Sequence, residues 1–425
     1  MAPATTTSRP LRLAALAATL ALGVAPSVAA GQAEEFWSIG RPYSDAARRM
    51  APVSAFPAPT PADELPTARL TAPPGFRVET FASDVLDARM MREGDKGVIF
   101  VSSLFVANRV YAIVPKPGGG REVKIVLQDT PLPNGVEFHK GALYVATPRR
   151  ILRFDDIENR LDNPGPPTVV YDGFPGDGPQ SWKALRVGPD GKLYVSVNAP
   201  CNVCEPGPLR GRIVRMNLDG TGLETVAEGV RTSVGLDFDP VTGELWFTDN
   251  QRDGLSDDMP SDELNRVTQA GQHFGFPYCH SGIMIDPEFG WGRSCDAYVR
   301  PAALLGAHMA PLGMRFYRGR MFPPTYAHAI FVARHGPWNR NRKNADVVAV
   351  LRDERGRVIS VEPFLTGFVQ DEDYVGRPVD VMPLKDGSLL VSDDHNGAIY
   401  RVTYEGPPAS PPRSEAGDPV TPARR

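Results

Sequence analysis

The stretch GPDGKLYVSV, residues 188–197, decides the fold class of this chain. A Pro-Asp-Gly turn leads directly into a short run of alternating apolar residues, which is typical of a β-hairpin strand. The same pattern occurs at five other places, although the copy at His328 lacks the glycine. The six motifs are KGVIFVSS from Lys96, KGALYVAT from Lys140, DGKLYVSV from Asp190, TGELWFTD from Thr242, HAIFVARH from His328 and DGSLLVSD from Asp386.

The spacing of these motifs is close to constant. The first four begin 44, 50 and 52 residues apart, and Thr242 to Asp386 is 144 residues, or three spacings of 48. Repeats of this length without long amphipathic helices indicate a β-propeller. We therefore predict an all-β, six-bladed propeller over residues 71–404, with an insertion between the fourth and fifth blade motifs.

The two ends of the chain differ in composition from the repeats. Residues 1–30 combine Arg9 and Arg12 with the apolar run 13–25 and small residues before position 31, which is the pattern of a cleaved signal peptide. Residues 31–70 and 405–425 are rich in proline and predict a disordered leader and tail. A periplasmic or secreted location follows. No later segment is apolar enough to span a membrane, and the net charge of −4 without a basic stripe argues against nucleic acid.

Four cysteines remain outside the signal segment: Cys201, Cys204, Cys279 and Cys295. An even number in an exported protein predicts disulfides, and the pairs nearest in sequence are Cys201–Cys204 and Cys279–Cys295. CNVC also matches half of a zinc site, but Cys279 and Cys295 do not supply the second half.

Carboxylates gather at the start of the insertion. Oxygen ligands grouped in one loop suit Ca²⁺, although the EF-hand spacing is absent. The alternative is a solvated acidic loop in which Asp262 caps a helix. The residues concerned are Asp249, Asp253, Asp257, Asp258, Asp262 and Glu263.

Cations and an aromatic ring occur together in HGPWNRNRK, residues 335–343. Trp338 can stack on a flat ring, and Arg340 and Lys343 can bind carboxylates. The alternative is an exposed basic turn with Trp338 packed between blades. Arg231 and Arg377 precede apolar strands of different blades, and a propeller brings such positions together at its axis. These residues predict a flat, anionic ligand at the channel mouth, beside a divalent cation.

From Pro73 to Tyr404 the chain resembles the soluble glucose and sorbosone dehydrogenases that use pyrroloquinoline quinone (PQQ), and the sorbosone type most of all. The stretches that carry the resemblance are PPGFRVETFAS, LPNGVEF, WKALRVGPDGKLYVSV followed by CNVC, RIVRMNLDGTG, DELNRV, HMAPLGMRFY, HGPWNR, and GRPVDV with LLVSDDHNGAIYRVTY.

The resemblance implies a propeller that binds PQQ and Ca²⁺ at its mouth. It implies oxidation of a sugar or sugar-derived aldehyde by hydride transfer to PQQ, with a histidine as general base. Ca²⁺ would polarise the quinone carbonyl. Electrons would then pass to a cytochrome or a quinone.

The resemblance also assigns roles to residues of this chain. Asn134 is expected near the substrate. The metal is expected at Asp262 and the adjacent Glu263, with carbonyl groups of Gln251 and Arg252. The expected cofactor-binding residues are Arg231, Thr232, Trp338, Asn339, Arg340, Lys343 and Arg377.

Gln180 is the main departure from the family. It occupies the position of the catalytic histidine, eight residues before Gly188 of GPDG, and an amide cannot take a proton near neutral pH. Thr232 also replaces an asparagine of the glucose-type enzymes. His308 and His335 are candidates for the missing base, as is an acidic residue such as Asp373.

Two other functions remain open from the sequence. A calcium-dependent lactone hydrolase can be built on a six-bladed propeller, but it needs no arginine clamp, so Arg231 and Arg377 argue against it. A propeller that binds PQQ without turnover is the third hypothesis, and Gln180 keeps it open.

Overall fold

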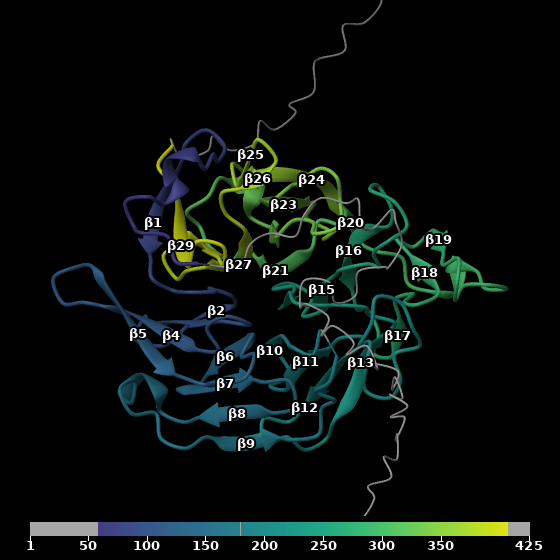
Figure 1. The fold of residues 1–425 in the computed structure, drawn as a ribbon, viewed down its shortest axis with the longest axis horizontal. Coiled ribbons are helices and arrows are strands. Elements are labelled where there is room, and N and C mark those ends of the chain that lie inside the picture. The colour runs from purple at the N-terminus through teal and green to yellow at the C-terminus, as the bar shows by residue number, and fades with distance from the viewer. Residues whose placement is uncertain (1–57, 179, 407–425) are drawn as a thin grey trace, which may run out of the picture. The chain divides into compact units, whose positions relative to one another are not determined.

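The computed structural model describes residues 58–178 and 180–406. Six antiparallel sheets surround one central axis, with the first strand of each sheet innermost (Figure 1). The first three blades are β2 (Met91–Glu93), β3 (Ile99–Ser102), β4 (Val110–Pro115) and β5 (Arg121–Leu127); β6 (Gly135–His139), β7 (Ala142–Ala146), β8 (Ile151–Phe154) and β9 (Thr168–Tyr171); and β10 (Leu185–Val187), β11 (Leu193–Val197), β12 (Arg212–Met216) and β13 (Glu224–Glu228).

The last blade closes the ring with a strand from the start of the domain. β1 pairs with β29 from Phe76↔Tyr404 to Ala82↔Ile399, so the two ends of the described chain lie in one sheet. The last three blades are β14 (Leu236–Phe238), β15 (Leu245–Asp249), β16 (Ser261–Arg266) and β20 (Ala303–Ala307); β21 (Pro311–Phe316), β22 (Ile330–Arg334), β23 (Asp346–Arg352) and β24 (Val358–Leu365); and β27 (Pro378–Pro383), β28 (Leu389–Asp393), β29 (Ala398–Tyr404) and β1 (Phe76–Ala82).

The six sequence motifs form the second strand of each blade, which confirms the predicted six-bladed propeller. Five of these strands, β3, β7, β11, β15 and β28, are buried along their whole length rather than on alternate residues. Both faces of each sheet pack against neighbouring blades, which explains this pattern. Trp246, Phe316 and Val332, for example, belong to one buried cluster that joins the fourth and fifth blades.

The insertion lies inside the fourth blade, between its third strand β16 and its fourth strand β20. Its strands lie toward the rim, away from the innermost strands (Figure 1). The predicted disulfide Cys279–Cys295 closes this segment, and the predicted Cys201–Cys204 bond lies after β11. The short elements of the insertion are β17 (Gln272–His273), which extends the third blade, the hairpin β18 (Cys279–His280) and β19 (Met284–Ile285), and the 3-10 helix η4 (Cys295–Ala297).

The ordered domain begins earlier than residue 71. Residues predicted as leader include the 3-10 helix η2 (Pro66–Arg69), and the amide of Thr60 donates to the carbonyl of Asn396 on the last blade. The disorder prediction is therefore wrong for 58–70. The predicted signal peptide, the first part of the leader and the tail from 407 lie outside the described residues. The remaining short elements are η3 (Ile157–Asn159), η5 (Pro324–Tyr326), β25 (Val369–Gln370) and β26 (Asp373–Tyr374).

Candidate functional site

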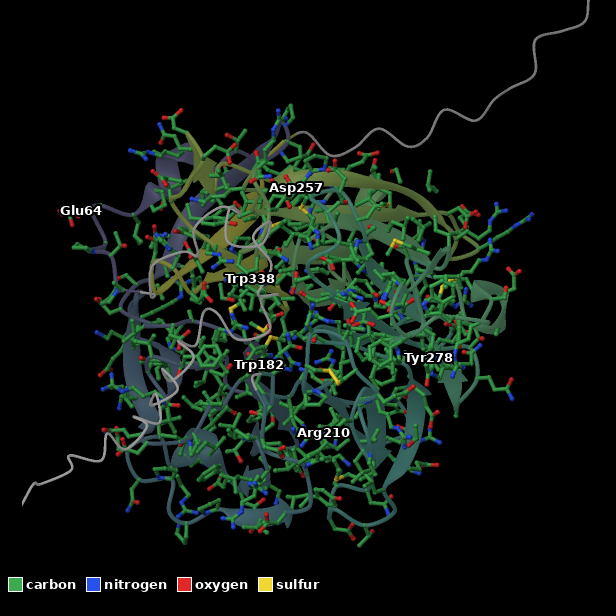
Figure 2. All side chains as sticks on the ribbon, turned by 45° about the vertical axis from the view of Figure 1, so that its right-hand side comes forward. Glu64, Trp182, Arg210, Asp257, Tyr278 and Trp338 are labelled. Atoms are coloured by element: carbon green, nitrogen blue, oxygen red, sulfur yellow. A yellow bond between two sulfur atoms is a disulfide. The ribbon has the colours of Figure 1, made fainter. Side chains whose placement is uncertain are left out.

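The sequence-predicted site residues come together at one end of the channel, which we call the mouth. It is the end at which the innermost strands begin and the second strands finish. Figure 2 shows Trp182 and Trp338 near the centre of the view, whereas Tyr278 of the insertion lies farther to the side.

In two blades, an aspartate at the end of the second strand accepts the backbone amide of an arginine at the mouth. Asp249, the last residue of β15, accepts the amide N–H of Arg231 at 3.1 Å and that of Thr232 at 2.7 Å. Asp393, the last residue of β28, accepts the amide of Arg377 at 2.9 Å. The sequence prediction that Arg231 and Arg377 occupy corresponding positions in their blades agrees with this geometry.

The guanidinium of Arg231 is buried among polar groups. It donates to the backbone and side-chain oxygens of Asn202, beside the Cys201–Cys204 bond, and to the carbonyl of Asn250. It also pairs with Asp253 at 3.3 Å. Asp253 in turn accepts a hydrogen bond from Asn339 and lies 3.5 Å from Nδ1 of His308.

His308 is paired with Asp253 and is not a free base. Burial lowers the pKa of His308, but the hydrogen bond and charge of Asp253, with the carbonyl of Ser256 and the charge of Asp262, together outweigh burial, and the net shift is upward. Nε2 of the ring also lies 2.6 Å from the carbonyl of Ser256. Both ring nitrogens are thus committed to protein oxygens.

His335 has the environment expected of a base. Its Nε2 lies 2.9 and 3.0 Å from the two carboxylate oxygens of Asp394, and its side chain keeps 14% exposure. Burial and the nearby Arg377 lower the pKa of His335 to about 4, so the ring is neutral at pH 7. A neutral ring with its proton on Nε2 has a lone pair on Nδ1 that can accept a proton.

Arg89 and Asp394 complete this cluster, and sequence reasoning missed both. Arg89 donates to Asp394 at 2.8 Å and to Asn134 at 3.2 Å, and the three side chains are buried. Burial opposes ionisation of Asp394, but His335, Arg89 and Arg377 together lower its pKa well below the usual range. Arg89 lies three residues before Arg92 of β2, and Arg377 lies three residues before Asp380 of β27. This shared spacing is visible in the sequence and could have identified Arg89 as a residue of the mouth.

The loop 335–343 connects the two arginine sites. Arg377 donates to the carbonyls of His335 and Gly336 at 3.1 and 3.0 Å, while Asn339 bonds Asp253 on the Arg231 side. Lys343 pairs with Asp373 at 3.4 Å, which places that candidate acid at the outer edge, and Arg340 pairs with Asp258 at 3.1 Å.

Gln180 faces Thr232, so the two departures from the family pattern contact each other. The hydroxyl of Thr232 donates to the Gln180 side-chain oxygen. Lys183 follows three residues later, and burial lowers the pKa of its ammonium group to about 7. Its Nζ donates to the carbonyl of Ser181 and lies 5.2 Å from the ring centre of Phe174.

The predicted calcium ligands are engaged with the protein itself. The carboxylate oxygens of Asp262 accept the amides of Gln251 and Ala310, and Glu263 accepts the amide of Ser281. Within 58–178 and 180–406, no group of three or more His, Cys, Asp or Glu side chains is placed to hold a metal ion. The role of Asp262 and Glu263 as calcium ligands stays a prediction, and Ser261–Arg266 is the strand β16 rather than a capped helix.

Gln251 and Arg252 anchor the insertion to the fourth blade. Nδ1 and Nε2 of the buried His280 lie 2.8 Å from Gln251 and 2.9 Å from Asp286, and Arg252 donates to Asp286 at 2.7 Å. Their side chains therefore have a structural role. Only their backbone carbonyls remain as possible metal ligands.

The arrangement is that of a propeller whose mouth combines cations, a histidine–aspartate pair and an aromatic wall. The family model described as Glucose / Sorbosone dehydrogenase matches residues 167–401, so the chain belongs to this family and is an oxidoreductase of the sugar dehydrogenase type. An uncharacterised protein of Borreliella burgdorferi is 32% identical over 359 residues, which cover 81% of this chain and 93% of that protein.

Solved structures show the same fold at low sequence identity. The calcium structure of a Trichoderma reesei carbohydrate-active enzyme of family AA12 has a TM-score of 0.70 at 18% identity, covering 82% of this chain and all of that one. The holo PQQ domain of Coprinopsis cinerea pyranose dehydrogenase has a TM-score of 0.66 at 18% identity, covering 82% and 98%. The Escherichia coli soluble aldose sugar dehydrogenase has 0.57 at 15%, covering 77% and 99%.

Proposed function

We propose that this protein is an exported PQQ-dependent dehydrogenase that oxidises a sugar or a sugar-derived aldehyde. The observation that carries the proposal is the His335–Asp394 pair at the mouth, with Arg89 bonded to Asp394 and Arg377 bonded to the carbonyl of His335. Arg231 lies on the Asp253 side of the loop 335–343. The N-terminal signal pattern supports a periplasmic or secreted location, and a cytochrome or quinone is the expected electron acceptor.

The mouth has polar groups that fit an anionic, flat cofactor. Nε of Arg340 and Nε1 of Trp182 are buried donors that have no hydrogen-bond partner in the described part of the chain. A buried donor without an acceptor is costly, and an anionic ligand would satisfy it. Arg231 and Arg377 would hold the cofactor carboxylates, and Trp338 would cover the ring. When bound, PQQ supplies a quinone that accepts a hydride from the substrate carbon.

Calcium enters the proposal only as an ion bound together with the cofactor. Asp262 and Glu263 are already engaged by backbone amides, so the protein ligands would be the carbonyl oxygens of Gln251 and Arg252. No step below depends on the ion.

His335 is the proposed general base in place of the histidine that Gln180 replaces. Its Nδ1 would take the proton of the substrate hydroxyl as hydride leaves the carbon. Asp394 would keep the ring in the required tautomer and stabilise the imidazolium that forms. A carboxylate bound beside Arg377 would offset the charge that lowers the pKa of His335, so the base would become stronger when the cofactor is present.

The test is reconstitution of the purified, exported protein with PQQ and Ca²⁺, followed by dye reduction with a panel of aldoses and aldehydes. We expect saturable cofactor absorbance and turnover of at least one sugar or aldehyde. Arg377→Gln should weaken PQQ binding, whereas Arg355→Gln, in an exposed turn, should not. Absence of PQQ binding would overturn the proposal. Binding without turnover would favour the non-catalytic propeller, and lactone hydrolysis without PQQ would favour the hydrolase.

A further inference from the structure

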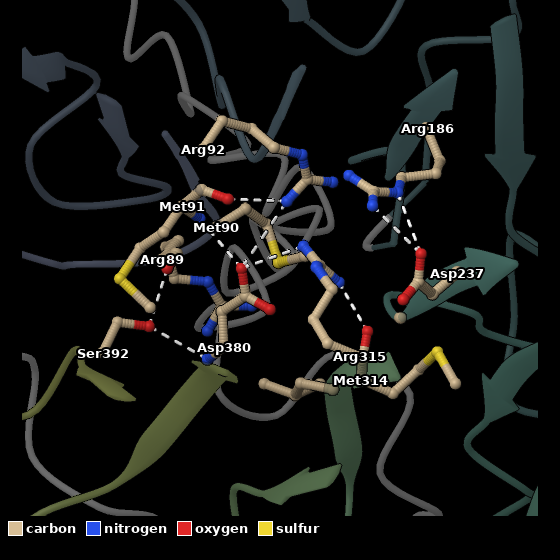
Figure 3. Close-up of polar contacts among 12 residues, drawn as sticks. Arg89, Met90, Met91, Arg92, Arg186, Asp237, Met314, Arg315, Asp380 and Ser392 are labelled. Carbon is tan, nitrogen blue, oxygen red and sulfur yellow. Dashed lines mark hydrogen bonds and ion pairs between the residues drawn. The ribbon is translucent and has the colours of Figure 1, made fainter. Parts of the chain in front are cut away.

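The end of the channel opposite the mouth is closed by a ring of charged side chains. Each innermost strand contributes one residue, and the signs alternate around the axis, as the close-up in Figure 3 shows for five of the six. We call this group the floor ring. Its members are Arg92 of β2, Glu137 of β6, Arg186 of β10, Asp237 of β14, Arg315 of β21 and Asp380 of β27.

A cavity of about 350 Å³ lies directly outside the floor ring. Cations predominate among the charged residues that line it within the described chain. The cations are Arg92, Arg186, Arg315, Arg318 and Lys385. The carboxylates are Glu93 and Glu137, while Asp237 and Asp380 do not line the cavity.

Two of these cations are buried, so their positive charge acts more strongly on an anion in the cavity. The side chains of Arg315 and Arg92 are 2% and 5% exposed, whereas Arg318 and Lys385 stand at the rim with 40% and 65% exposure. Burial raises the pKa of Glu93, which lies 3.8 Å from the ammonium group of Lys385. Charges in such a partly desolvated cavity attract a counter-ion more strongly than the same charges on an open surface.

Arg315 has donors to spare. Its two hydrogen bonds in the described residues run from Nη1 to the carbonyl of Met314 at 2.6 Å and from Nη2 to Asp380 at 3.2 Å. A guanidinium carries five N–H donors. The other oxygen of Asp380, Oδ1, lies against Gly313 and accepts no hydrogen bond within the described residues.

We propose that this cavity is a binding site for a phosphate-sized oxyanion, separate from the sugar and cofactor site at the mouth. The anion would accept N–H donors from Arg315 and would be held at the rim by Arg318 and Lys385. Charge-assisted hydrogen bonds of guanidinium groups to phosphoryl oxygens have the required geometry and strength. This inference does not depend on the proposed dehydrogenase activity.

The experiment is titration calorimetry of the full chain with inorganic phosphate at constant ionic strength, with thermal unfolding as a second readout. We expect saturable binding and a rise in Tm with phosphate but not with chloride. The double variant Arg318→Gln/Lys385→Gln should bind at least tenfold more weakly. Arg355→Gln, which removes an exposed cation elsewhere, should bind like the wild type. Glucose 6-phosphate and sulfate distinguish a phosphorylated sugar from a free oxyanion.

Two results would overturn the proposal. One is a phosphate effect no larger than that of chloride at equal ionic strength. The other is unchanged affinity in the double variant. If Arg318→Gln disturbs folding through its partner Asp237, Lys385→Gln alone keeps the test decisive, because its side chain is 65% exposed and a loss of several-fold is still expected.

Discussion

Buried carboxylates occur at both ends of the channel but bond to different groups. In the floor ring, Asp237 accepts guanidinium hydrogen bonds from Arg186 and Arg318, and Glu137 accepts them from Arg92. At the mouth, Asp249 and Asp262 accept backbone amides instead. These carboxylates are therefore stabilised by arginine side chains in the floor ring and by backbone N–H dipoles at the mouth.

This difference reverses the direction of the pKa shifts. Burial opposes ionisation at both ends, but the arginines outweigh it for Asp237 and Glu137, whose pKa values fall below the usual range. For Asp249 and Asp262 at the mouth burial dominates, and it raises the pKa of Asp249 to about 7 and that of Asp262 to about 6. Asp394 is the exception at the mouth, because His335, Arg89 and Arg377 lower its pKa. Carboxylates with raised pKa values therefore occur at the mouth, as they commonly do at functional sites.

The largest expected effect is catalytic and concerns the mouth. His335→Gln removes the proposed base but leaves the arginines in place, so kcat should fall by about 10²–10⁴-fold while PQQ binding is kept. Steady-state kinetics with the reconstituted enzyme measure kcat, and a PQQ titration measures cofactor binding. His139→Gln, in β6, is the control and should leave kcat unchanged. A His335→Gln enzyme with wild-type kcat would remove His335 from the mechanism.

The next effect is on stability and concerns the floor. Asp237→Asn leaves the guanidinium of Arg318 without its carboxylate partner and leaves Arg186 paired with Glu137 alone. Removing one partner of a buried ion pair typically costs about 3–5 kcal/mol in the free energy of unfolding. Urea denaturation measures it. Asp353→Asn breaks an exposed pair with Arg357 and should cost much less. Equal losses in the two variants would show that the floor ring has no special role in stability.

A smaller effect is the pH dependence of stability contributed by the mouth. Asp249 titrates near pH 7 when folded and near 3.8 when unfolded, so between these values the folded state holds the extra proton. Stability from this group is therefore present at low pH and is lost as pH rises through about 7. The free energy of unfolding should fall by about 0.8 kcal/mol from pH 6.5 to 8, a window above the usual pKa of histidine.

The variant Asp249→Asn measures how much of this pH dependence of stability comes from Asp249. It cannot lose a proton, so the slope between pH 6.5 and 8 should flatten, while Asp237→Asn should leave the slope as it is because Asp237 is ionised throughout. The residual slope belongs to other groups: His308, whose pKa is also raised, loses stability in the same direction, whereas Lys183, whose pKa burial lowers to about 7, gains stability as pH rises. An unchanged slope in Asp249→Asn would assign the titration to other groups.

The sequence predicted the fold, and it predicted that Arg231 and Arg377 occupy corresponding positions in their blades. The six strand motifs are local patterns, and both disulfides join cysteines close in sequence, so neither needed tertiary information. Asp394 and Arg89 were missed because their roles arise from contact across 305 positions of chain, between the first and last blades. Asp262 and Glu263 stay predicted calcium ligands, and the sequence did not reveal that backbone amides already bond to these carboxylates.

The smallest expected effect concerns Gln180, and it separates positioning from proton transfer. Because Gln180 bonds the hydroxyl of Thr232 and His335 has the base-like environment, Gln180→His should change kcat by less than about tenfold and should not alter the pH profile set by His335. Thr232→Val, which removes the partner hydroxyl, is the matched variant and should act through KM more than kcat. A gain of 10²-fold or more in Gln180→His would mean that proton transfer belongs at position 180 and that His335 is not the base.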